Sequence, residues 1–345
     1  MLAIVKTAPG PGNVELRDMP EPSPAPHQVK LEVAACGLCG TDLHVLHDTF
    51  RNFPPVILGH EMAGRVVAEG EAVKGSTDPQ ARYAVLGATA SIDPGDPLVR
   101  SGHFILSPNR RGMGHGVHGG FCRHVVARPD QLFRLDDSVA TEDGALVEPL
   151  AAAVHAVTEQ ASMRAGDSAL VSGPGPIGLY CLMVLRHLGI RTFVAGTAAD
   201  HARLALAREL GAERTIDVEH ENLGDIVRTA TGGSGVDVAF EVAGVSASAA
   251  AGLRALRPLG QYVQVGHFGR DIAVPFDLVA FKELTVRGSV GYTEATWRRT
   301  LALLAQGLRP SRIVTHRLPL TQWQEAFAAF AEKRAAKVLL IPDER

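Results

Sequence analysis

The chain has 345 residues, more than one hydrophobic core usually organises, and its hydrophobic content of 46% is enough to fill two domains. The formal net charge is −3 and the basic residues are dispersed, which excludes a broad nucleic-acid surface or an anionic-membrane patch. No apolar stretch reaches the roughly 18 residues of a membrane span, the N-terminus has no secretory signal pattern, and four cysteines are too few for a disulfide framework. We therefore expect a cytoplasmic protein whose partners are small molecules, not nucleic acid or membrane.

The predicted elements change character along the chain. From residue 1 to about 135, short β-type runs such as QVKLEVAAC lie between Pro and Gly turns, which predicts an irregular, mostly β domain. Residues 151–285 alternate apolar strands with helical stretches, the pattern of a parallel sheet with helices on both faces. Residues 286–345 could extend this sheet or return to the first domain. The expected fold class is α/β.

The first candidate site lies in AACGLCGTDLH, residues 34–44. The Cys36-x-x-Cys39 spacing is also that of a redox pair, but such a pair belongs at a strand-to-helix turn of a βαβ unit, and this one follows a β run in the irregular part. Cys39, His60 in GHE and Glu148 in VEPL offer sulfur, nitrogen and oxygen, which zinc accepts, and three protein ligands leave one position open for catalysis. Spacing alone leaves structural or surface roles open for these residues.

The second candidate site is a glycine-rich turn, SALVSGPGPIG, between an apolar strand and an apolar helix. Its glycines allow a tight turn and close approach to a pyrophosphate, while the helix N-terminus supplies free N–H groups and positive potential. The pattern therefore predicts a dinucleotide site. The residues of this turn are Gly173, Gly175, Pro176, Ile177 and Gly178.

Two later strand ends bear on the cofactor. Where an NAD-binding strand would end in an acidic residue, TFVAGTAADHARL has Thr197, with Arg203 on the following helix. The 2′-phosphate of NADP would not be repelled there, and Thr197 with backbone groups could also hold NAD, so both cofactors stay open. Val265, Gly266 and His267, in VQVGHFG, end another strand at the ligand edge and are expected to hold the carboxamide side of the nicotinamide.

The motifs CGLCGTDLH, GHE, EPLA and GPGPIG occur in the order, and at roughly the separations, seen in the zinc-dependent medium-chain alcohol dehydrogenases. The chain resembles this family, especially its sorbitol and threonine dehydrogenase branch, over nearly its whole length. The resemblance implies a GroES-like catalytic domain over residues 1–150, completed by residues 286–345, and a Rossmann dinucleotide-binding domain over residues 151–285. It also implies a homodimer or homotetramer formed through edge strands of the cofactor domain.

The resemblance assigns roles to the residues of the first site. It implies that Cys39, His60 and Glu148 bind the catalytic zinc, with Glu61 as an alternate or water-mediated ligand. Asp42 would be the carboxylate that orients His60, a partner that metal-binding histidines commonly need.

The resemblance also implies a reaction and a proton path. Thr41 would hydrogen-bond the substrate hydroxyl, and His44 would pass its proton to solvent through the cofactor ribose. Hydride would pass between a secondary alcohol, such as a polyol, a cyclitol or a related hydroxy compound, and NAD or NADP. The zinc would polarise the substrate oxygen, and the cleft between the domains would hold the nicotinamide against it.

Two other interpretations stay open. A metal-free quinone or enone reductase of the same superfamily, using NADPH, would need none of Cys39, His60 and Glu148. A non-catalytic protein that binds nucleotide or zinc would need no proton relay through Thr41 and His44.

The chain departs from the family in one respect. Many relatives carry a second, structural zinc bound by four cysteines on a lobe, and the corresponding positions here are Asp93, Asp96, Val99 and Ser107. Valine cannot bind zinc, and the remaining three residues are a poor tetrahedral set. We therefore predict one zinc per chain.

Overall fold

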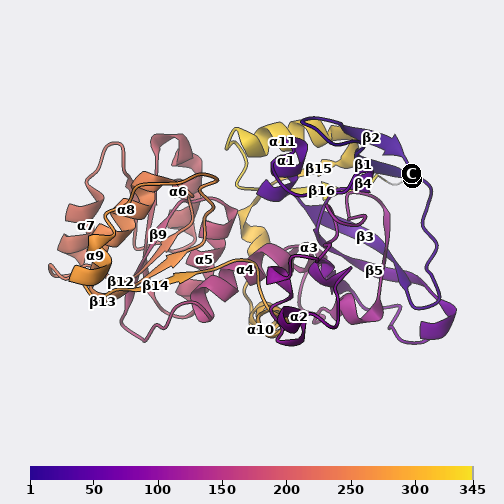
Figure 1. Cartoon of the computed structure of the whole chain (residues 1–345), viewed down its shortest axis with the longest axis horizontal. Coiled ribbons are helices and arrows are strands. Elements are labelled where there is room, and N and C mark those ends of the chain that lie inside the picture. The colour runs from indigo at the N-terminus through magenta and orange to yellow at the C-terminus, as the bar shows by residue number, and fades with distance from the viewer. Residues whose placement is uncertain (344–345) are drawn as a thin grey trace. The chain divides into compact units, whose positions relative to one another are not determined.

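The computed structural model describes residues 1–343 and divides the chain into two compact units (Figure 1). Unit 1 comprises Met1–Glu148 and Thr293–Arg345, and unit 2 comprises Pro149–Tyr292. Each unit has its own sheet and its own apolar core. Within the described residues, no helix has both the length and the apolar character needed to cross a bilayer.

Unit 1 is built on a seven-stranded sheet with the order β15-β16-β3-β5-β6-β8, and β7 pairs with β3. The strands are β3 (Val29–Gly37), β5 (Glu61–Glu69), β6 (Tyr83–Val85), β7 (His124–Ala127), β8 (Leu132–Arg134), β15 (Val314–Pro319) and β16 (Lys337–Ile341). Apart from the parallel pair β15–β16, its strands pair antiparallel. Residues of β3 alternate between buried and more exposed positions over most of its length, as expected where one face of a strand packs on a core.

A smaller sheet and several short helices complete unit 1. The small sheet has the order β2-β1-β4, formed by β1 (Leu2–Lys6), β2 (Val14–Asp18) and β4 (Val56–Ile57). The helices are α1 (Gly40–Leu46), α2 (Pro97–Arg100), α3 (Thr141–Ala145), α10 (Glu294–Ala305) and α11 (Trp323–Ala331). Helix α4 (Val147–Thr158) contains the boundary between the two units.

Unit 2 has a six-stranded parallel sheet with the order β11-β10-β9-β12-β13-β14. Its strands are β9 (Ser168–Ser172), β10 (Arg191–Gly196), β11 (Arg214–Asp217), β12 (Val236–Glu241), β13 (Leu256–Gln264) and β14 (Thr285–Gly288). Every residue of β9 is buried, as expected of a central strand covered on both faces. The strand order reverses between β9 and β12, and ligands of such sheets bind at the carboxyl ends of the strands near this point.

Helices cover both faces of this sheet (Figure 1). They are α5 (Pro176–His187), α6 (His201–Glu209), α7 (Leu223–Ala230), α8 (Ser246–Ala255) and α9 (Asp277–Phe281). Leu223 and Leu253, from α7 and α8, share an apolar cluster with Leu170 and Phe193 of the sheet. The predicted α/β class and the predicted parallel sheet are confirmed.

Residues 286–345 are divided between the two positions that the sequence left open, the parallel sheet and the first domain. Strand β14 extends the parallel sheet of unit 2 by pairing with β13, whereas the chain from Thr293 onward belongs to unit 1. There β16 pairs with β3 through Leu339↔Gly37 and Leu340↔Cys36. This pairing brings the C-terminal strand beside the segment that leads to Cys39.

Candidate metal centre and cofactor turn

Cys39 lies in the short connection between β3 and α1. It is the N-cap residue of α1, with extended backbone angles. Asp42, three residues on, turns its carboxylate back, and its Oδ2 accepts a hydrogen bond from the Cys39 N–H at 2.9 Å. This reciprocal arrangement at the start of a helix fixes the direction in which Cys39 leaves the strand.

The same carboxylate also holds the second ligand segment. Asp42 is 1% exposed, and its Oδ1 accepts a hydrogen bond from the Gly59 N–H at 3.3 Å and lies 3.7 Å from His60 Nδ1. Burial raises the pKa of Asp42 above its ordinary value, although His60 and the two N–H groups act in the opposite direction. One buried carboxylate therefore fixes Cys39 and His60 relative to each other, in the position predicted for the group that orients the histidine.

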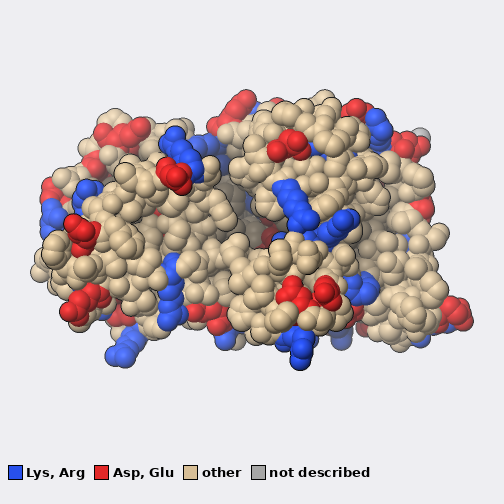
Figure 2. Space-filling view, in the orientation of Figure 1, with Lys and Arg blue, Asp and Glu red and all other residues tan. Residues whose placement is uncertain are grey.

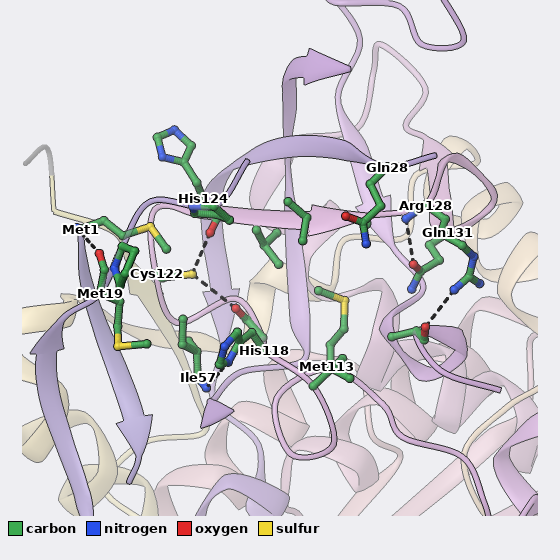
Figure 3. A pocket seen from close by; sticks show the side chains of 18 residues that line it. Met1, Met19, Gln28, Ile57, Met113, His118, Cys122, His124, Arg128 and Gln131 are labelled. Carbon is green, nitrogen blue, oxygen red and sulfur yellow. Dashed lines mark hydrogen bonds between the residues drawn. The ribbon is translucent and has the colours of Figure 1, made fainter. Parts of the chain in front are cut away.

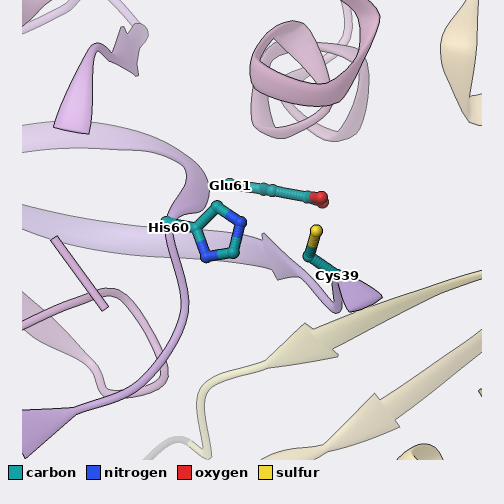
Figure 4. A group of neighbouring side chains, drawn as sticks. All are labelled: Cys39, His60 and Glu61. Atoms are coloured by element: carbon teal, nitrogen blue, oxygen red, sulfur yellow. The ribbon is translucent and has the colours of Figure 1, made fainter. Parts of the chain in front are cut away.

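Three predicted side chains meet at this point. Cys39, His60 and Glu61 each offer one ligand atom, and the three atoms lie within 4.8 Å of one another (Figure 4). Tetrahedral zinc ligands at their usual bond lengths are roughly 3.5 Å apart, so a small closure would complete the geometry. Figure 4 shows one ring nitrogen of His60 turned toward Cys39 and Glu61, and because Nδ1 faces Asp42, this nitrogen is Nε2.

The electrostatics of the group favour a cation. Burial alone would lower the pKa of His60, but the negative charges of Asp42, Cys39 and Glu148 outweigh it and raise that pKa well above its usual value. Glu61 Oε2 is buried and lies 2.6 Å from Lys337 Nζ, in an ion pair that is not aligned as a hydrogen bond. A sulfur, an imidazole nitrogen and such an oxygen form a donor set that fits zinc.

The structure places Glu61 rather than Glu148 in the group. Glu61 pairs with Gly37 in the β3–β5 ladder, and a Cβ atom on Gly37 would lie 1.9 Å from Glu61 Oε2. Only glycine leaves room for the carboxylate at this point. Glu148 acts on His60 through its charge but is not one of the three residues whose ligand atoms all lie within 4.8 Å of one another, so its role as a ligand stays a prediction.

Lys337 of β16 is a member of this site that the sequence analysis missed. Its Nζ donates to Glu61 Oε1 at 2.7 Å and to the Leu38 carbonyl at 2.8 Å, and the ammonium is buried. Burial lowers the pKa of Lys337, but the charges of Glu61 and Cys39 outweigh it, so the net shift is upward. The sequence does contain a sign of this role, because Lys337 is the one charged residue in the apolar run AAKVLLIP and a charged residue in a buried strand requires a partner.

Thr41 and His44 lie one helical turn apart on α1. The Thr41 Oγ1 is 3.7 Å from the Cys39 sulfur. His44 is exposed, and its Nδ1 is 3.0 Å from Thr49 Oγ1. Thr41 is therefore beside the metal group, and His44 is on the solvent side of the same helix.

Cys36 does not share the environment of Cys39. Its side chain is fully buried, and burial raises the pKa of its thiol well above the usual value. Both cysteines are free. A thiol held protonated in this way is a poor redox partner, which disfavours the redox-pair interpretation.

The glycine-rich turn of unit 2 has the backbone geometry of a phosphate-binding turn. Gly173 has a φ of +106°, Gly175 is the N-cap of α5 with open space where a side chain would be, and a Cβ on Gly178 would lie 1.9 Å from the Gly173 carbonyl oxygen. The first glycine therefore allows a tight turn, the second leaves access for a ligand, and the third allows the helix to pack closely on the strand. Pro176 and Ile177 are the first two residues of α5.

The predicted ribose-binding position contains an internal network. Thr197 follows β10, and its Oγ1 donates to Asp200 Oδ2 at 2.9 Å. Arg203 is 7% exposed and has Nη1 3.9 Å from Asp200 Oδ1. The acidic residue nearest the strand end is therefore engaged with the protein itself.

The strand ends predicted to face the nicotinamide are organised by Glu241. The N–H groups of Val265 and Gly266 both donate to the Glu241 carbonyl, at 2.9 and 2.8 Å. The buried Glu241 carboxylate accepts from Gln264 Nε2 at 2.7 Å, and the same amide donates to the Gly266 carbonyl. Glu241 is a structural residue that fixes the loop leading to His267.

A separate cavity of about 540 Å³ lies in unit 1 and contains none of the predicted site residues (Figure 3). Its wall includes Met1, Met19, Met113 and Cys122. His118 Nδ1 accepts a hydrogen bond from the Ile57 N–H at 3.1 Å. The wall is mostly apolar, so it offers little of the acid–base or metal chemistry found at the Cys39 group.

Two models of protein-family domains match the chain. The family model described as a zinc-binding dehydrogenase matches residues 176–306, and the family model described as an alcohol dehydrogenase GroES-like domain matches residues 25–137. A sorbitol dehydrogenase from Halalkalibacterium halodurans is 35% identical over 99% of both chains, and a D-arabitol-phosphate dehydrogenase from Enterococcus avium is 32% identical over 99% of this chain and 97% of the relative. A Sinorhizobium meliloti structure described as a zinc-binding dehydrogenase bound to NADP has a TM-score of 0.87, with 31% identity over 99% of both chains.

Replacing Lys337 by methionine tests the buried ion pair. The Lys337→Met variant leaves the Glu61 carboxylate buried without its ammonium, so we expect the free energy of unfolding of the metal-free protein to fall by about 3–5 kcal/mol. Urea unfolding in the presence of a zinc chelator measures this change in the free energy of unfolding. The double variant Lys337→Met/Glu61→Gln should regain most of the loss, and Lys74→Met, at an exposed lysine, should change stability by less than about 0.5 kcal/mol. A loss below about 1 kcal/mol in the single variant would contradict a strong pair.

Proposed function

The chain belongs to the zinc-dependent medium-chain alcohol dehydrogenase family and is an oxidoreductase that transfers hydride between an alcohol and NAD(P), and we propose that Cys39, His60 and Glu61 hold its catalytic zinc. The observation that carries the proposal is the convergence of their three ligand atoms within 4.8 Å. The family membership confirms the resemblance seen in the sequence motifs. It disfavours both the metal-free reductase and the non-catalytic binding protein.

The residues around the metal group have separate tasks. A bound zinc acts as a Lewis acid that polarises the alcohol oxygen and lowers the pKa of its hydroxyl. The Asp42 carboxylate lies 3.7 Å from Nδ1 of His60, and this charge on one side of the ring favours the orientation in which Nε2 faces the group. Thr41, beside Cys39, accepts the hydrogen bond of the substrate hydroxyl, and the exposed His44 passes the proton toward solvent.

The phosphate-binding turn of unit 2 holds the cofactor. The N–H groups at the start of α5 and the open space at Gly175 suit a pyrophosphate. Thr197 and Arg203 lie where the adenosine ribose is recognised, and Val265, Gly266 and His267 hold the nicotinamide end. The nearby carboxylate, that of Asp200, accepts a hydrogen bond from Thr197, so no free carboxylate at this strand end would repel the 2′-phosphate of NADP. NADP is the cofactor named for the Sinorhizobium meliloti structure.

The chain binds one zinc. Of the four lobe positions that bear cysteines in many relatives, Asp96 and Ser107 are joined by a hydrogen bond of 2.6 Å from Ser107 Oγ to Asp96 Oδ2. The other oxygen of Asp96 accepts from the Leu98 N–H at 2.8 Å and so caps α2. Direct hydrogen bonds thus close the lobe at positions where relatives use a metal.

The substrate is a small secondary alcohol and its product is the ketone. The relatives described as sorbitol and arabitol-phosphate dehydrogenases support a polyol or a polyol derivative.

The protein self-associates through the edge of the unit 2 sheet. Strand β14 pairs with β13 on one side and ends the sheet order on the other, and all four of its residues are exposed. Phe276, the N-cap of α9, and Phe281, the last residue of this helix, precede β14 in the chain and are 63% and 83% exposed. An unpaired strand edge with apolar neighbours is a surface that a second copy of the chain can cover.

Zinc content distinguishes the two carboxylates. We expect one zinc per chain in the wild-type protein, and neither zinc nor turnover in Cys39→Ala. Glu61→Gln should weaken zinc binding by more than about 100-fold, whereas Glu148→Gln should weaken it by about 10- to 100-fold, as for a group outside the ligand set. Elemental analysis after dialysis against graded chelator measures this, with the exposed Glu71→Gln as control.

A larger loss in Glu148→Gln than in Glu61→Gln would instead make Glu148 the third ligand. Full activity in Cys39→Ala would contradict the zinc mechanism, and two zinc ions per chain would contradict the account of the lobe.

Thr41→Ala tests the proton path. The variant keeps the metal ligands but loses the hydroxyl, so kcat should fall by about 10²- to 10⁴-fold with zinc content unchanged. Thr41→Ser, which restores a hydroxyl, should recover most of the rate. Equal kcat values in the alanine variant and the wild type would remove Thr41 from the reaction.

Val286→Lys tests the sheet edge. Val286 is 42% exposed on β14, and a charge there should prevent a second strand from adding. Light scattering should give a multiple of the 36.5 kDa chain mass for the wild type and 36.5 kDa for the variant. A wild-type protein of 36.5 kDa, or a variant of unchanged mass, would oppose this interface.

A further inference from the structure

Basic side chains gather on two neighbouring loops of unit 1. Arg51 and Arg111 each lie over the ring of Phe53, with guanidinium carbons 4.9 and 4.0 Å from its centre. Arg110 adds a third positive charge next to Arg111, and we call these three arginines the arginine cluster. Figure 2 shows several Lys and Arg side chains close together on the face of unit 1 that lies between α1 and α2 in Figure 1.

The arginine cluster is anchored to the segment that carries a metal ligand. The loop following Arg111 packs directly on Gly59, the residue before His60: the Gly120 N–H donates to the Gly59 carbonyl at 2.9 Å, and a Cβ on Gly119 would lie 2.0 Å from that oxygen. The contact is backbone on backbone and therefore close.

His115 links the two regions. Its carbonyl accepts a hydrogen bond from the Phe53 N–H at 2.9 Å, and its ring meets Phe50 edge-on at 5.1 Å between centroids. Burial, together with the positive charges of His60, Arg110 and Arg51, lowers the pKa of His115 to about 3. The Phe53 hydrogen bond and the Phe50 ring contact therefore join the loop of Arg51 to the loop of Arg110 and Arg111.

The charge of Arg51 and Arg111 is not balanced within the protein. Over residues 1–343, the contacts of these two guanidinium groups are with the Phe53 ring and, for Arg51 Nη1, with the Pro108 carbonyl at 2.6 Å, and none is an ion pair with a carboxylate. Asp48, on the same loop as Arg51, accepts hydrogen bonds from the Gly10 N–H and from Asn52. By contrast, Arg317 makes two hydrogen bonds of 2.7 Å to Glu142.

We propose that the arginine cluster is a subsite for an anionic group of the substrate, so that the preferred alcohol carries a carboxylate or a phosphate ester. This rests on the proposed function, because it places the reacting hydroxyl at the Cys39 group. Two guanidinium groups stacked on one aromatic ring are restricted in orientation, and their planar donors match carboxylate and phosphate oxygens. Both side chains are exposed, so a bound anion would replace the water that solvates them, whereas a neutral polyol would offer them no opposite charge.

Anion binding tests the subsite without requiring turnover. Calorimetric titration of the zinc-loaded protein with inorganic phosphate, and separately with acetate, should give a measurable affinity. The affinity for each anion should fall by about 10- to 100-fold in the Arg51→Ala/Arg111→Ala double variant, because charge-assisted hydrogen bonds are lost. Arg51→Lys/Arg111→Lys should show a smaller loss, and Arg100→Ala, an exposed arginine on α2, should show none.

Kinetics identify the source of the anion. The kcat/KM values for arabitol, arabitol phosphate and the matching hydroxy acid arabinonate should favour an anionic compound by at least about tenfold in the wild type, and the alanine double variant should remove this preference mainly through KM. A phosphate preference points to phosphate esters, and an acetate and arabinonate preference to hydroxy acids.

The failures can be told apart. Equal binding of both anions by the wild type and the double variant would overturn the subsite, as would competition of phosphate with NADP but not with the alcohol. Retention of phosphate binding by zinc-free Cys39→Ala protein would support the subsite even if the zinc assignment failed. Loss of turnover with every alcohol, but with arginine-dependent phosphate binding, would count against the proposed reaction and not against the subsite.

Discussion

The metal group depends on one buried carboxylate, that of Asp42. Its two oxygens accept hydrogen bonds from the N–H groups of Cys39 and Gly59, at 2.9 and 3.3 Å. The two N–H groups are twenty residues apart in the sequence, and this one side chain bonds both of them. A carboxylate removed from water has few alternative hydrogen-bond partners, so these two hydrogen bonds are held firmly. The fixed backbones in turn fix the positions of the Cys39 and His60 side chains.

A second buried charge closes the group from the opposite end of the chain. Lys337 reaches Glu61 because β16 pairs with β3, and Glu61 lies over Gly37 because β5 pairs with the same strand. In the proposed site, a bound zinc would share this carboxylate with the ammonium. Lys337 therefore compensates the charge of Glu61 and sets its direction, with Nζ 2.7 Å from Oε1 and 2.6 Å from Oε2.

Charges of opposite sign are segregated around the site. The metal group is rich in negative charge, which raises the pKa of His60, whereas the arginine cluster is positive and packs on the loop beside it. Separated charges of this kind orient a substrate that carries both a hydroxyl and an anion, because each end is attracted to a different part of the site. In unit 2, the buried Glu241 carboxylate accepts hydrogen bonds from Gly244, Ser248 and Gln264 and so orders the ends of the neighbouring strands.

The sequence by itself determined the features that depend on neighbouring residues. The alternation of strands and helices gave the parallel sheet, because hydrophobic periodicity is local, and the Gly173 to Gly178 turn could be predicted because each glycine meets a local backbone requirement. The family resemblance carried by the motifs implied Cys39, His60 and Glu148 as zinc ligands, with Glu61 only as an alternate or water-mediated ligand. Only the tertiary structure decided that Glu61 joins them, that Lys337 stands behind it and that Arg51 and Arg111 meet over Phe53. These contacts depend on strand pairing and loop packing between distant segments, and the spacing of residues along a chain does not specify which of those segments will meet.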